Sequence, residues 1–284
     1  MRSPVESLHS EAFEDYQRKI RIHLTPVFRT SIWVMAAVLL IGPFHLATAM
    51  EKRLLLGPSP KDVDVNGLPR GWQVLRFHDI PRQTQYVVDM EGNRYAIKAV
   101  SESSASGIYT EVNLQPEIFQ QFSWEWKVGN LIQKGDATQK SGDDFPARVI
   151  VAFRYQSDRA SLFKRVKYEL TQFIYGRYPP GSALVYVWDH QFPVGSMFDN
   201  AYTDWAKVVV VESGPSKVGQ WVIERRNLIA DYKSIFGKDP PQLQFIGIMT
   251  DTDDTEERAV AYYRQITLES PSIGLHSAIE RERK

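Results

Sequence analysis

Regular alternation of apolar and polar residues is the feature of this sequence that most limits its fold. Between positions 122 and 128, every second residue is large and apolar, namely Phe122, Trp124, Trp126 and Val128. A period of two places all of these side chains on one face of an extended strand, whereas a helix would scatter them around its axis. The segment is therefore predicted to be a strand with one buried face.

β-rich runs of the same kind recur along most of the chain, with turn sequences such as Glu91-Gly92-Asn93 between them. The further predicted strands are Trp72–Phe77, Gln85–Asp89, Arg94–Val100, Arg148–Tyr155, Ala183–Trp188, Lys207–Glu212, Gln220–Glu224, Leu243–Met249 and Ala259–Leu268. Strands and helices do not alternate as they do in parallel α/β sheets. We therefore predict an all-β fold, an antiparallel β-sandwich or jelly roll.

Two segments have the period of an amphipathic helix instead. Asn227 is predicted to cap a helix over Leu228–Phe236, which ends at Gly237. Ser161–Tyr175 is the second predicted helix. The predicted organisation is a linker at 50–67, a single sandwich domain at 68–270 with a helical insertion near 157–180, and a polar tail at 271–284.

Residues 1–49 have the pattern of an extension followed by an export signal. Ile32–Ile41 is an uncharged apolar run that would cover about 15 Å as a helix, half of a bilayer core. Ala47-Thr48-Ala49 has small residues where signal peptidase cleaves, so cleavage between Ala49 and Met50 and a periplasmic location are predicted. The alternative is an inner-membrane anchor formed by residues 32–50. In both cases this segment is the only predicted contact with the membrane.

Composition excludes several classes of function. The chain has 284 residues and no cysteine, which rules out disulfides, a thiol nucleophile and cysteine-based metal centres. Its 34 basic residues balance 34 acidic ones, and no basic stripe with interleaved aromatics occurs, so nucleic acid is not an expected partner. The common nucleotide-binding, serine-hydrolase and zinc-protease motifs are absent, which argues against a familiar enzyme.

Polar residues crowd at two places beside predicted strands. Asp143 and Asp144 precede the strand that begins at Arg148, where the arginine either pairs with one of these carboxylates or binds a ligand with them. Further along, Glu224 and Arg226 share one face of a strand, where they form either an ion pair or further ligand contacts. Both sets combine charges that suit sugar hydroxyls or a uronate.

An acidic turn follows the apolar strand 243–249. Asp251, Asp253 and Asp254 place three carboxylates within four residues, and no Lys or Arg follows them before Arg258. Calcium takes about six to eight oxygen ligands, so these three residues form a hypothetical calcium site. The alternatives are an ordinary acidic turn between two strands and a catalytic use of the carboxylates.

Several short motifs occur in a fixed order between Leu68 and Leu268. They are L-P-x-G-W (Leu68–Trp72), S-x-S-S-A-S-G (Ser101–Gly107), W-x-W-K-V (Trp124–Val128), D-D-F-P-A-R-V (Asp143–Val149), Y-V-W (Tyr186–Trp188), W-x-x-E-x-R-N (Trp221–Asn227), D-Y-x-x-x-F-G (Asp231–Gly237) and D-T-D-x-T (Asp251–Thr255). This series resembles the bacterial family called domain of unknown function 3047. The resemblance implies an exported β-sandwich similar to carbohydrate-binding jelly rolls, and it brings no established activity.

The first functional hypothesis is a non-catalytic, exported binding protein whose ligand is a saccharide or a glycan of the cell envelope. Aromatic platforms and bidentate arginines suit such a ligand. The predicted ligand contacts are Asp144, Arg148, Glu224 and Arg226, with Trp126 or Trp188 as the stacking surface.

Two alternatives belong to other classes. A polysaccharide hydrolase or lyase would use Asp144, Glu224 and one of Asp251 or Asp253 as acid and base. A structural protein of the envelope would use the polar clusters only to brace loops. The enzyme requires the carboxylates of separate clusters to converge in space, and the sequence does not decide this.

Overall fold

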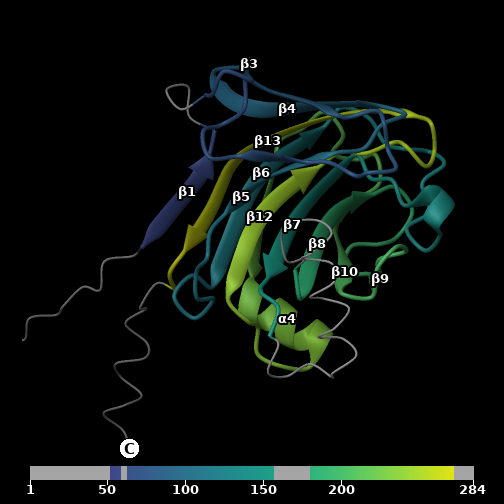
Figure 1. Ribbon diagram of the computed structural model, residues 1–284. Coiled ribbons are helices and arrows are strands. Elements are labelled where there is room, and N and C mark those ends of the chain that lie inside the picture. Colours follow the sequence, from purple (N-terminus) through teal and green to yellow (C-terminus); the bar gives the residue numbers. More distant parts are fainter. Residues whose placement is uncertain (1–51, 59–62, 157–179, 272–284) are drawn as a thin grey trace, which may run out of the picture. The chain divides into compact units, whose positions relative to one another are not determined.

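The structure is a computed structural model that describes residues 52–58, 63–156 and 180–271 (Figure 1). Contacts divide the chain into two compact units, Met1–Ala49 and Met50–Lys284, and all described residues belong to the second. Most described residues are in strands, which form two sheets packed face to face. The prediction of an all-β sandwich is confirmed. The predicted helix at 161–175 lies outside the described residues.

The first sheet (sheet I) has six strands and the second (sheet II) has seven. The order in sheet I is β11 (Val222–Asn227), β6 (Gln121–Val128), β13 (Arg258–Glu269), β4 (Arg94–Glu102) and β3 (Gln85–Glu91), and β1 (Arg53–Gly57) also pairs with β13. The order in sheet II is β2 (Gln73–Leu75), β5 (Gly107–Glu111), β12 (Leu243–Met249), β7 (Ala147–Phe153), β8 (Ser182–Asp189), β10 (Ala206–Ser213) and β9 (Met197–Asp199). A short 3-10 helix, η1 (Lys140–Gly142), precedes β7.

The sheets differ from the sequence-based prediction in three respects. β8 and β10 run parallel, because the connection 190–205 is long enough to return the chain to the end where β8 began. β1 lies inside the range 50–67 that was predicted as a linker, and its pairing with β13 makes it part of sheet I. Two short strands, β5 and β9, were not predicted; β5 directly follows the serine-rich run 101–106, and β9 has only three residues.

β8 is buried on both faces, which explains its almost continuous apolar sequence. Leu184, Tyr186 and Trp188 face the core between the two sheets. The residues between them face a second hydrophobic cluster on the opposite side of sheet II, to which Phe145 and Phe192 also belong. β6 differs from β8, because only one of its faces is buried. It shows the strict alternation of buried and partly exposed residues that the sequence predicts for 122–128.

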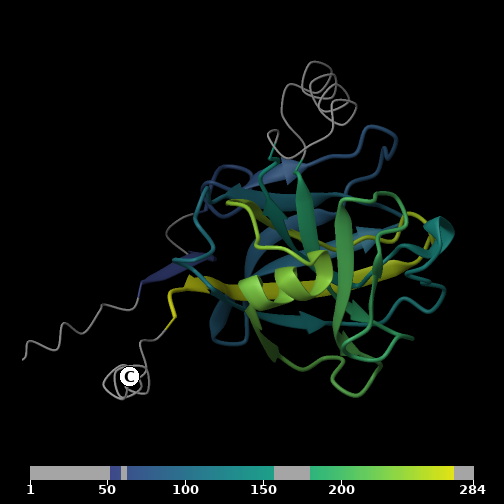
Figure 2. The ribbon, with the colours of Figure 1, turned by 90° about the horizontal axis from the view of Figure 1, so that it is seen from below.

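The helix α4 (Leu228–Phe236) directly follows β11 and lies across one end of the sandwich (Figure 2). Tyr232 is fully buried, with its ring centroid 4.6 Å from that of Phe153 and its hydroxyl 2.8 Å from the Ser182 hydroxyl. Gly237 ends the helix in the left-handed conformation, with φ of 67°.

Asn227 caps α4 as the sequence predicts, since its side-chain oxygen accepts a hydrogen bond from the Ala230 N–H at 2.9 Å. We expect Asn227→Ala to lower the free energy of unfolding by about 1 kcal/mol, and Asn227→Asp, which keeps the acceptor, to be nearly neutral. Urea unfolding followed by circular dichroism measures both. Equal midpoints for the alanine variant and the wild type would contradict the capping role.

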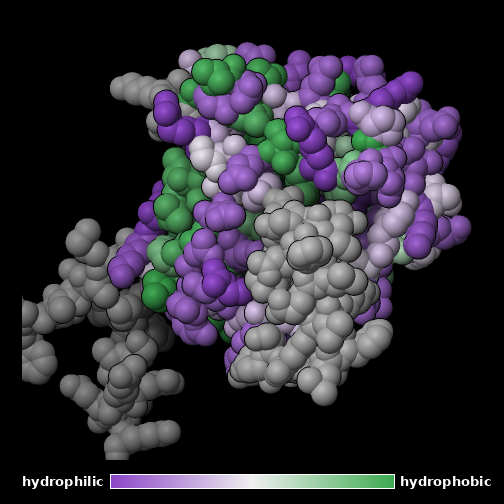
Figure 3. All heavy atoms as spheres, viewed as in Figure 1, coloured by the Kyte–Doolittle hydropathy of each residue, from purple (hydrophilic) through white to green (hydrophobic). Residues whose placement is uncertain are grey.

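The surface seen in Figure 3 is mostly hydrophilic, and its hydrophobic side chains gather toward the side of the molecule that carries β1. Leu55 of β1 is one of the large hydrophobic residues that remain exposed. In the part of the chain that the structure describes, no helix combines the length and the apolar character needed to cross a membrane.

Candidate functional site

Arg148 binds two of the predicted carboxylates at one end of sheet II. It lies near the start of β7, and Asp251 follows the end of the antiparallel neighbour β12, so the register brings the two positions together. Arg148 Nε donates to Asp251 Oδ1 at 2.8 Å, and Nη2 donates to the second oxygen of the same carboxylate. Arg148 Nη1 contacts Asp143 Oδ1 at 3.3 Å. All three side chains are buried, so this arginine braces the loop internally.

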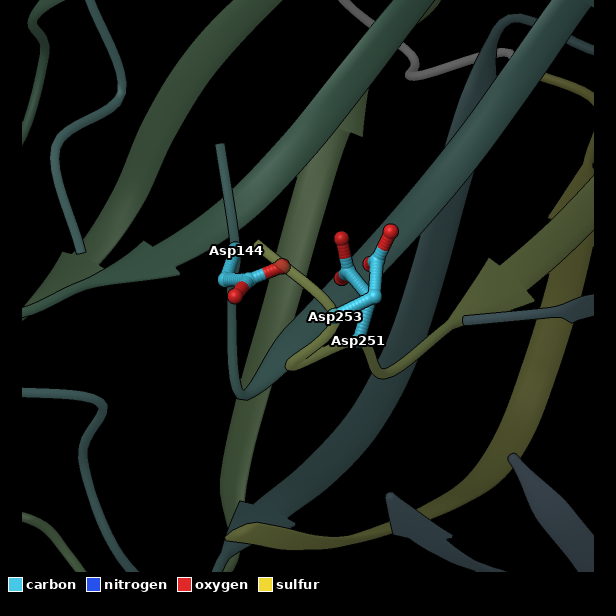
Figure 4. Close-up of side chains that lie close together, drawn as sticks. All are labelled: Asp144, Asp251 and Asp253. Carbon is cyan, nitrogen blue, oxygen red and sulfur yellow. The ribbon is translucent and has the colours of Figure 1, made fainter. Parts of the chain in front are cut away.

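Asp144 and Asp253 lie beside this ion pair. Asp144, Asp251 and Asp253 each place one carboxylate oxygen so that these three atoms lie within 4.8 Å of one another (Figure 4). Asp144 accepts hydrogen bonds from two backbone N–H groups of the acidic turn 251–256, the shorter at 2.6 Å. Within the described ranges, Asp253 makes no ion pair or hydrogen bond with another residue. Asp253 is therefore the carboxylate best placed to meet an added cation.

Burial and mutual repulsion act on the carboxylates of this cluster. Burial, followed by the negative charges of Asp144 and Asp254, raises the pKa of Asp253 to about 6. Burial also raises the pKa of Asp251, and its ion pair with the arginine opposes this change. The Tyr202 hydroxyl donates to the Asp254 carboxylate at 2.7 Å. Among the described residues, the cluster therefore contains more carboxyl groups than the Arg148 guanidinium can pair with.

The calcium hypothesis stays a prediction, and Asp253 now provides its sharpest test. A cation that binds only the folded state stabilises it, by about 2.7 kcal/mol at a hundredfold excess over Kd. We expect calcium to raise the melting temperature of the wild type and a chelator to lower it. Asp253→Asn should abolish this response without breaking the ion pair of Arg148, whereas the exposed control Asp79→Asn should keep it. Equal melting curves in calcium and in chelator would leave Arg148 as the compensating charge.

Glu224 and Arg226 form a separate polar group on the inner side of the edge strand β11. Their partners across the strand pair are core residues of β6, so both side chains face sheet II. Arg226 makes two hydrogen bonds to Asp231, at 2.7 and 2.8 Å, and the same carboxylate accepts from the Tyr186 hydroxyl at 2.8 Å. Arg226 therefore joins β11, α4 and β8.

The two predicted clusters have different charged partners. The charged groups that act on Glu224 are Glu212, Lys217 and Arg226, and those that act on Asp251 are Arg148, Asp144 and Asp143. No contact between described residues joins Glu224 to Asp144 or Asp251. The interactions of the described residues therefore give no support to an acid–base pair of Asp144 and Glu224, which the enzyme hypothesis requires.

Glu224 is expected to make stability depend on pH. Burial, followed by repulsion from Glu212, raises its pKa from 4.5 to about 7. The folded state then binds more protons than the unfolded state between these values, so this group lowers stability as the pH rises from about 4.5 to 7. Glu224→Gln should therefore be more stable than the wild type at pH 8, by about 1–2 kcal/mol, and equally stable at pH 4. Denaturant titrations at both values test this, with the exposed Glu117→Gln as control. A constant difference across pH would contradict it.

The expected stacking surface at Trp126 or Trp188 is wrong. Both side chains are fully buried between the sheets, and their rings pack against each other with centroids 5.9 Å apart. They lie on the inward side of β6 and β8, where the period of two places the largest apolar residues. A ligand on the surface therefore cannot reach either indole.

The outer face of sheet I carries a row of aromatic and basic residues instead. Adjacent strands pair Val87 with Lys98, Lys98 with Tyr262, and Tyr262 with Lys127. The Lys127 ammonium lies 4.5 Å from the centre of the Tyr262 ring and 5.6 Å from the centre of the Trp221 indole, just before β11. These five residues, the aromatic row, cross the sheet from β3 to β11, and all are partly or fully exposed.

The Trp221 indole packs against Arg264 on this face. The guanidinium carbon of Arg264 is 3.6 Å from the centre of the indole, which is contact distance for two stacked planes. Arg264 is buried and held by Glu125 at 2.7 Å, so it covers the inner side of the indole. Trp221 remains partly exposed, so part of its indole is open to contact with a ligand.

Sequence reasoning missed the aromatic row for an identifiable reason. Lys127 and Tyr262 occupy the outward positions of their strands, and the alternation alone shows this. Their proximity depends on the pairing of β6 with β13, which are more than a hundred residues apart in the chain. Outward-facing aromatic residues in predicted strands were the available signal.

A model of the family described as "Protein of unknown function (DUF3047)" matches residues 70–267, most of the sandwich. The chain belongs to this family, as the ordered motifs indicated. No curated protein matches the sequence.

Solved structures with a similar arrangement include two kinds of carbohydrate-related protein. One is the family 11 carbohydrate-binding module of the cellulase Lic26A-Cel5E from Clostridium thermocellum, at 10% identity and a TM-score of 0.36, covering 78% of this chain and 95% of that one. Another is the xyloglucanase domain of NopAA, a type three effector from Sinorhizobium fredii, at 8% identity and a TM-score of 0.35, covering 67% of this chain and 98% of that one. Neither ligand nor activity is transferred from these proteins to this chain.

Proposed function

We propose that this protein binds a saccharide of the cell envelope, without catalysis, on the outer face of sheet I. The observation that carries the proposal is Trp221, a partly exposed indole with the Arg264 guanidinium over its ring. A flat indole stacks on the apolar face of a pyranose ring, and neighbouring cations and carboxylates bind its hydroxyls. Lys127, which pairs with the Glu91 carboxylate, is such a cation, and Tyr262 adds an aromatic hydroxyl.

The state of Asp144, Asp251 and Glu224 supports binding over catalysis, and Asp253 is the one candidate carboxylate that keeps a free oxygen among the described residues. Asp251 is held at both oxygens by Arg148, and Asp144 is held by two backbone N–H groups. A general acid or base needs a free oxygen within reach of its substrate. Glu224, whose raised pKa suits proton transfer, faces inward from the edge of sheet I rather than toward the aromatic row.

A glycan array followed by titration calorimetry tests the proposal. Trp221→Ala should weaken the binding of any array hit by at least about tenfold, because it removes the central stacking surface. Met197→Ala, which shortens an exposed hydrophobic side chain of sheet II, should bind as the wild type does. Binding unchanged by Trp221→Ala would overturn this site. Shortened or unsaturated products after incubation would overturn the absence of catalysis.

We also propose that the protein acts in the periplasm. The short apolar run Ile32–Ile41 and the small residues Ala47-Thr48-Ala49 support cleavage by signal peptidase. N-terminal sequencing of protein from a periplasmic extract should begin at Met50. An intact N-terminus recovered in the membrane fraction would favour the anchor at residues 32–50 instead.

A further inference from the structure

A polar pocket lies on the same outer face of sheet I as the aromatic row. It has a volume of about 310 Å³, close to the lower end of the range for small-molecule sites. The lining residues are Arg82, Gln83, Gln85, Val100, Glu102 and Ser104. Its walls therefore come from β3, from β4 and from the segments that adjoin them.

The pocket continues the aromatic row along two strands. Gln85 pairs with Val100, and two residues further along the same strands Val87 pairs with Lys98. Two residues of a strand span about 7 Å, so the pocket begins one side-chain row away from Lys98. From Lys98 to Trp221 the face crosses three strand spacings, about 14 Å. A ligand that touches both Trp221 and the pocket is therefore longer than one pyranose ring.

The charge of the pocket points to an anionic group. Glu102 is paired with Arg258 at 2.8 Å, which neutralises the one carboxylate of the lining. Among the described residues, neither the Arg82 guanidinium nor the Gln85 amide has a hydrogen-bond or ion-pair partner. A free guanidinium beside a free amide matches a carboxylate, which accepts two parallel hydrogen bonds from arginine. Lys98, in the aromatic row, also lacks an ion-pair partner among these residues.

The backbone around the pocket is held in place before any ligand binds. The Ala105 N–H donates to the Arg82 carbonyl oxygen at 3.2 Å, and the Thr84 hydroxyl donates to the Thr250 carbonyl oxygen at 2.7 Å. Thr84 is buried, so this segment is anchored to sheet II between Arg82 and Gln85. A preformed wall reduces the entropy that a ligand must offset on binding.

We infer that the ligand is an acidic oligosaccharide, whose uronate carboxylate is bound by Arg82 in this pocket while another sugar residue stacks on Trp221. This inference rests on the proposed function and deepens it, because it names the class of saccharide. It also assigns the two ends of the outer face different tasks, namely stacking at Trp221 and recognition of charge at Arg82.

Matched pairs of probes test the inference by titration calorimetry. Tetramers of galacturonate, mannuronate and glucuronate-containing glycan are compared with their methyl esters, which keep the sugar and remove the charge. At least one acidic tetramer should bind the wild type at least about tenfold more tightly than its ester does. Arg82→Gln should bind that tetramer as weakly as the wild type binds the ester, whereas the control Arg154→Gln on the other sheet should behave as the wild type.

The outcomes separate this inference from the proposed function. Trp221→Ala should weaken the acid and the ester alike, since stacking does not depend on the carboxylate. Equal binding of acid and ester that still depends on Trp221 would overturn the inference and leave the proposed function standing. Array hits that depend on Trp221 but are all neutral glycans would likewise overturn the inference and leave the proposed function standing. If Arg82→Gln loses affinity for acid and ester alike, the inference that Arg82 recognises the carboxylate is also overturned. If any probe binds independently of Trp221, the proposed function is overturned.

Discussion

Replacing Arg148 by methionine is expected to lower the free energy of unfolding by about 3–5 kcal/mol. The guanidinium is buried and binds both Asp251 and Asp143, so its removal leaves two carboxylates in a site from which water is excluded. An unpaired buried charge costs far more than an exposed one, because the interior screens it poorly. Denaturant unfolding at pH 7 measures the loss.

Arg94→Met is the matched control for this prediction. Arg94 also contacts a carboxylate, that of Glu125 at 3.3 Å, but it is about half exposed, and exposed pairs contribute about 0–1 kcal/mol. The loss in the Arg148 variant should shrink at low pH, where protonation removes the charge of the two aspartates. A loss below about 1 kcal/mol at pH 7 would show that the carboxylates are neutralised in another way, as by a cation.

Trp124→Ala is expected to destabilise the fold by about 3–5 kcal/mol. The indole is fully buried at the centre of the sandwich, where it contacts the rings of Phe122, Trp126 and Tyr186 at centroid distances of 5.1–5.5 Å. Its removal leaves a cavity that side chains of both sheets would have to fill. Thermal and urea unfolding measure the change.

Trp221→Ala separates the core from the surface in the same experiments. This indole is partly exposed on the outer face of sheet I, so its removal should cost much less, about 1 kcal/mol or below. Trp124→Phe, which keeps a large ring in the core, should retain saccharide binding, whereas Trp221→Ala should lose it. Similar losses of stability for the two alanine variants would contradict the assignment of Trp221 to the surface.

Local patterns in the sequence were sufficient for the elements that depend on neighbouring residues. The alternation at 122–128 became β6, whose residues are buried at every second position. Asn227 caps α4 because its side chain needs only the N–H three residues further on. The short strand β5 and the parallel pairing of β8 with β10 escaped prediction, because neither depends on a local period.

The candidate sites depended on contacts between residues far apart in the chain. The sequence singled out Arg148 and Asp251 separately, but their pairing required the register of β7 against β12. It also assigned Trp126 and Trp188 to a ligand, although the alternation at 122–128 already placed Trp126 on the buried face of its strand.

By itself, the sequence determined that the chain forms a β-sandwich, because the period of two fixes which side chains share a face and requires that face to be buried. It also determined the cap of α4 and the crowding of carboxylates at residues 251–254. Only the tertiary structure decided which clusters meet. Strand order and register placed Lys127 beside Tyr262, gave Glu224 and Asp251 different charged partners, and brought Gln85 and Val100 together at the pocket. These relations arise from hydrogen bonds between strands distant in sequence, which no local pattern encodes.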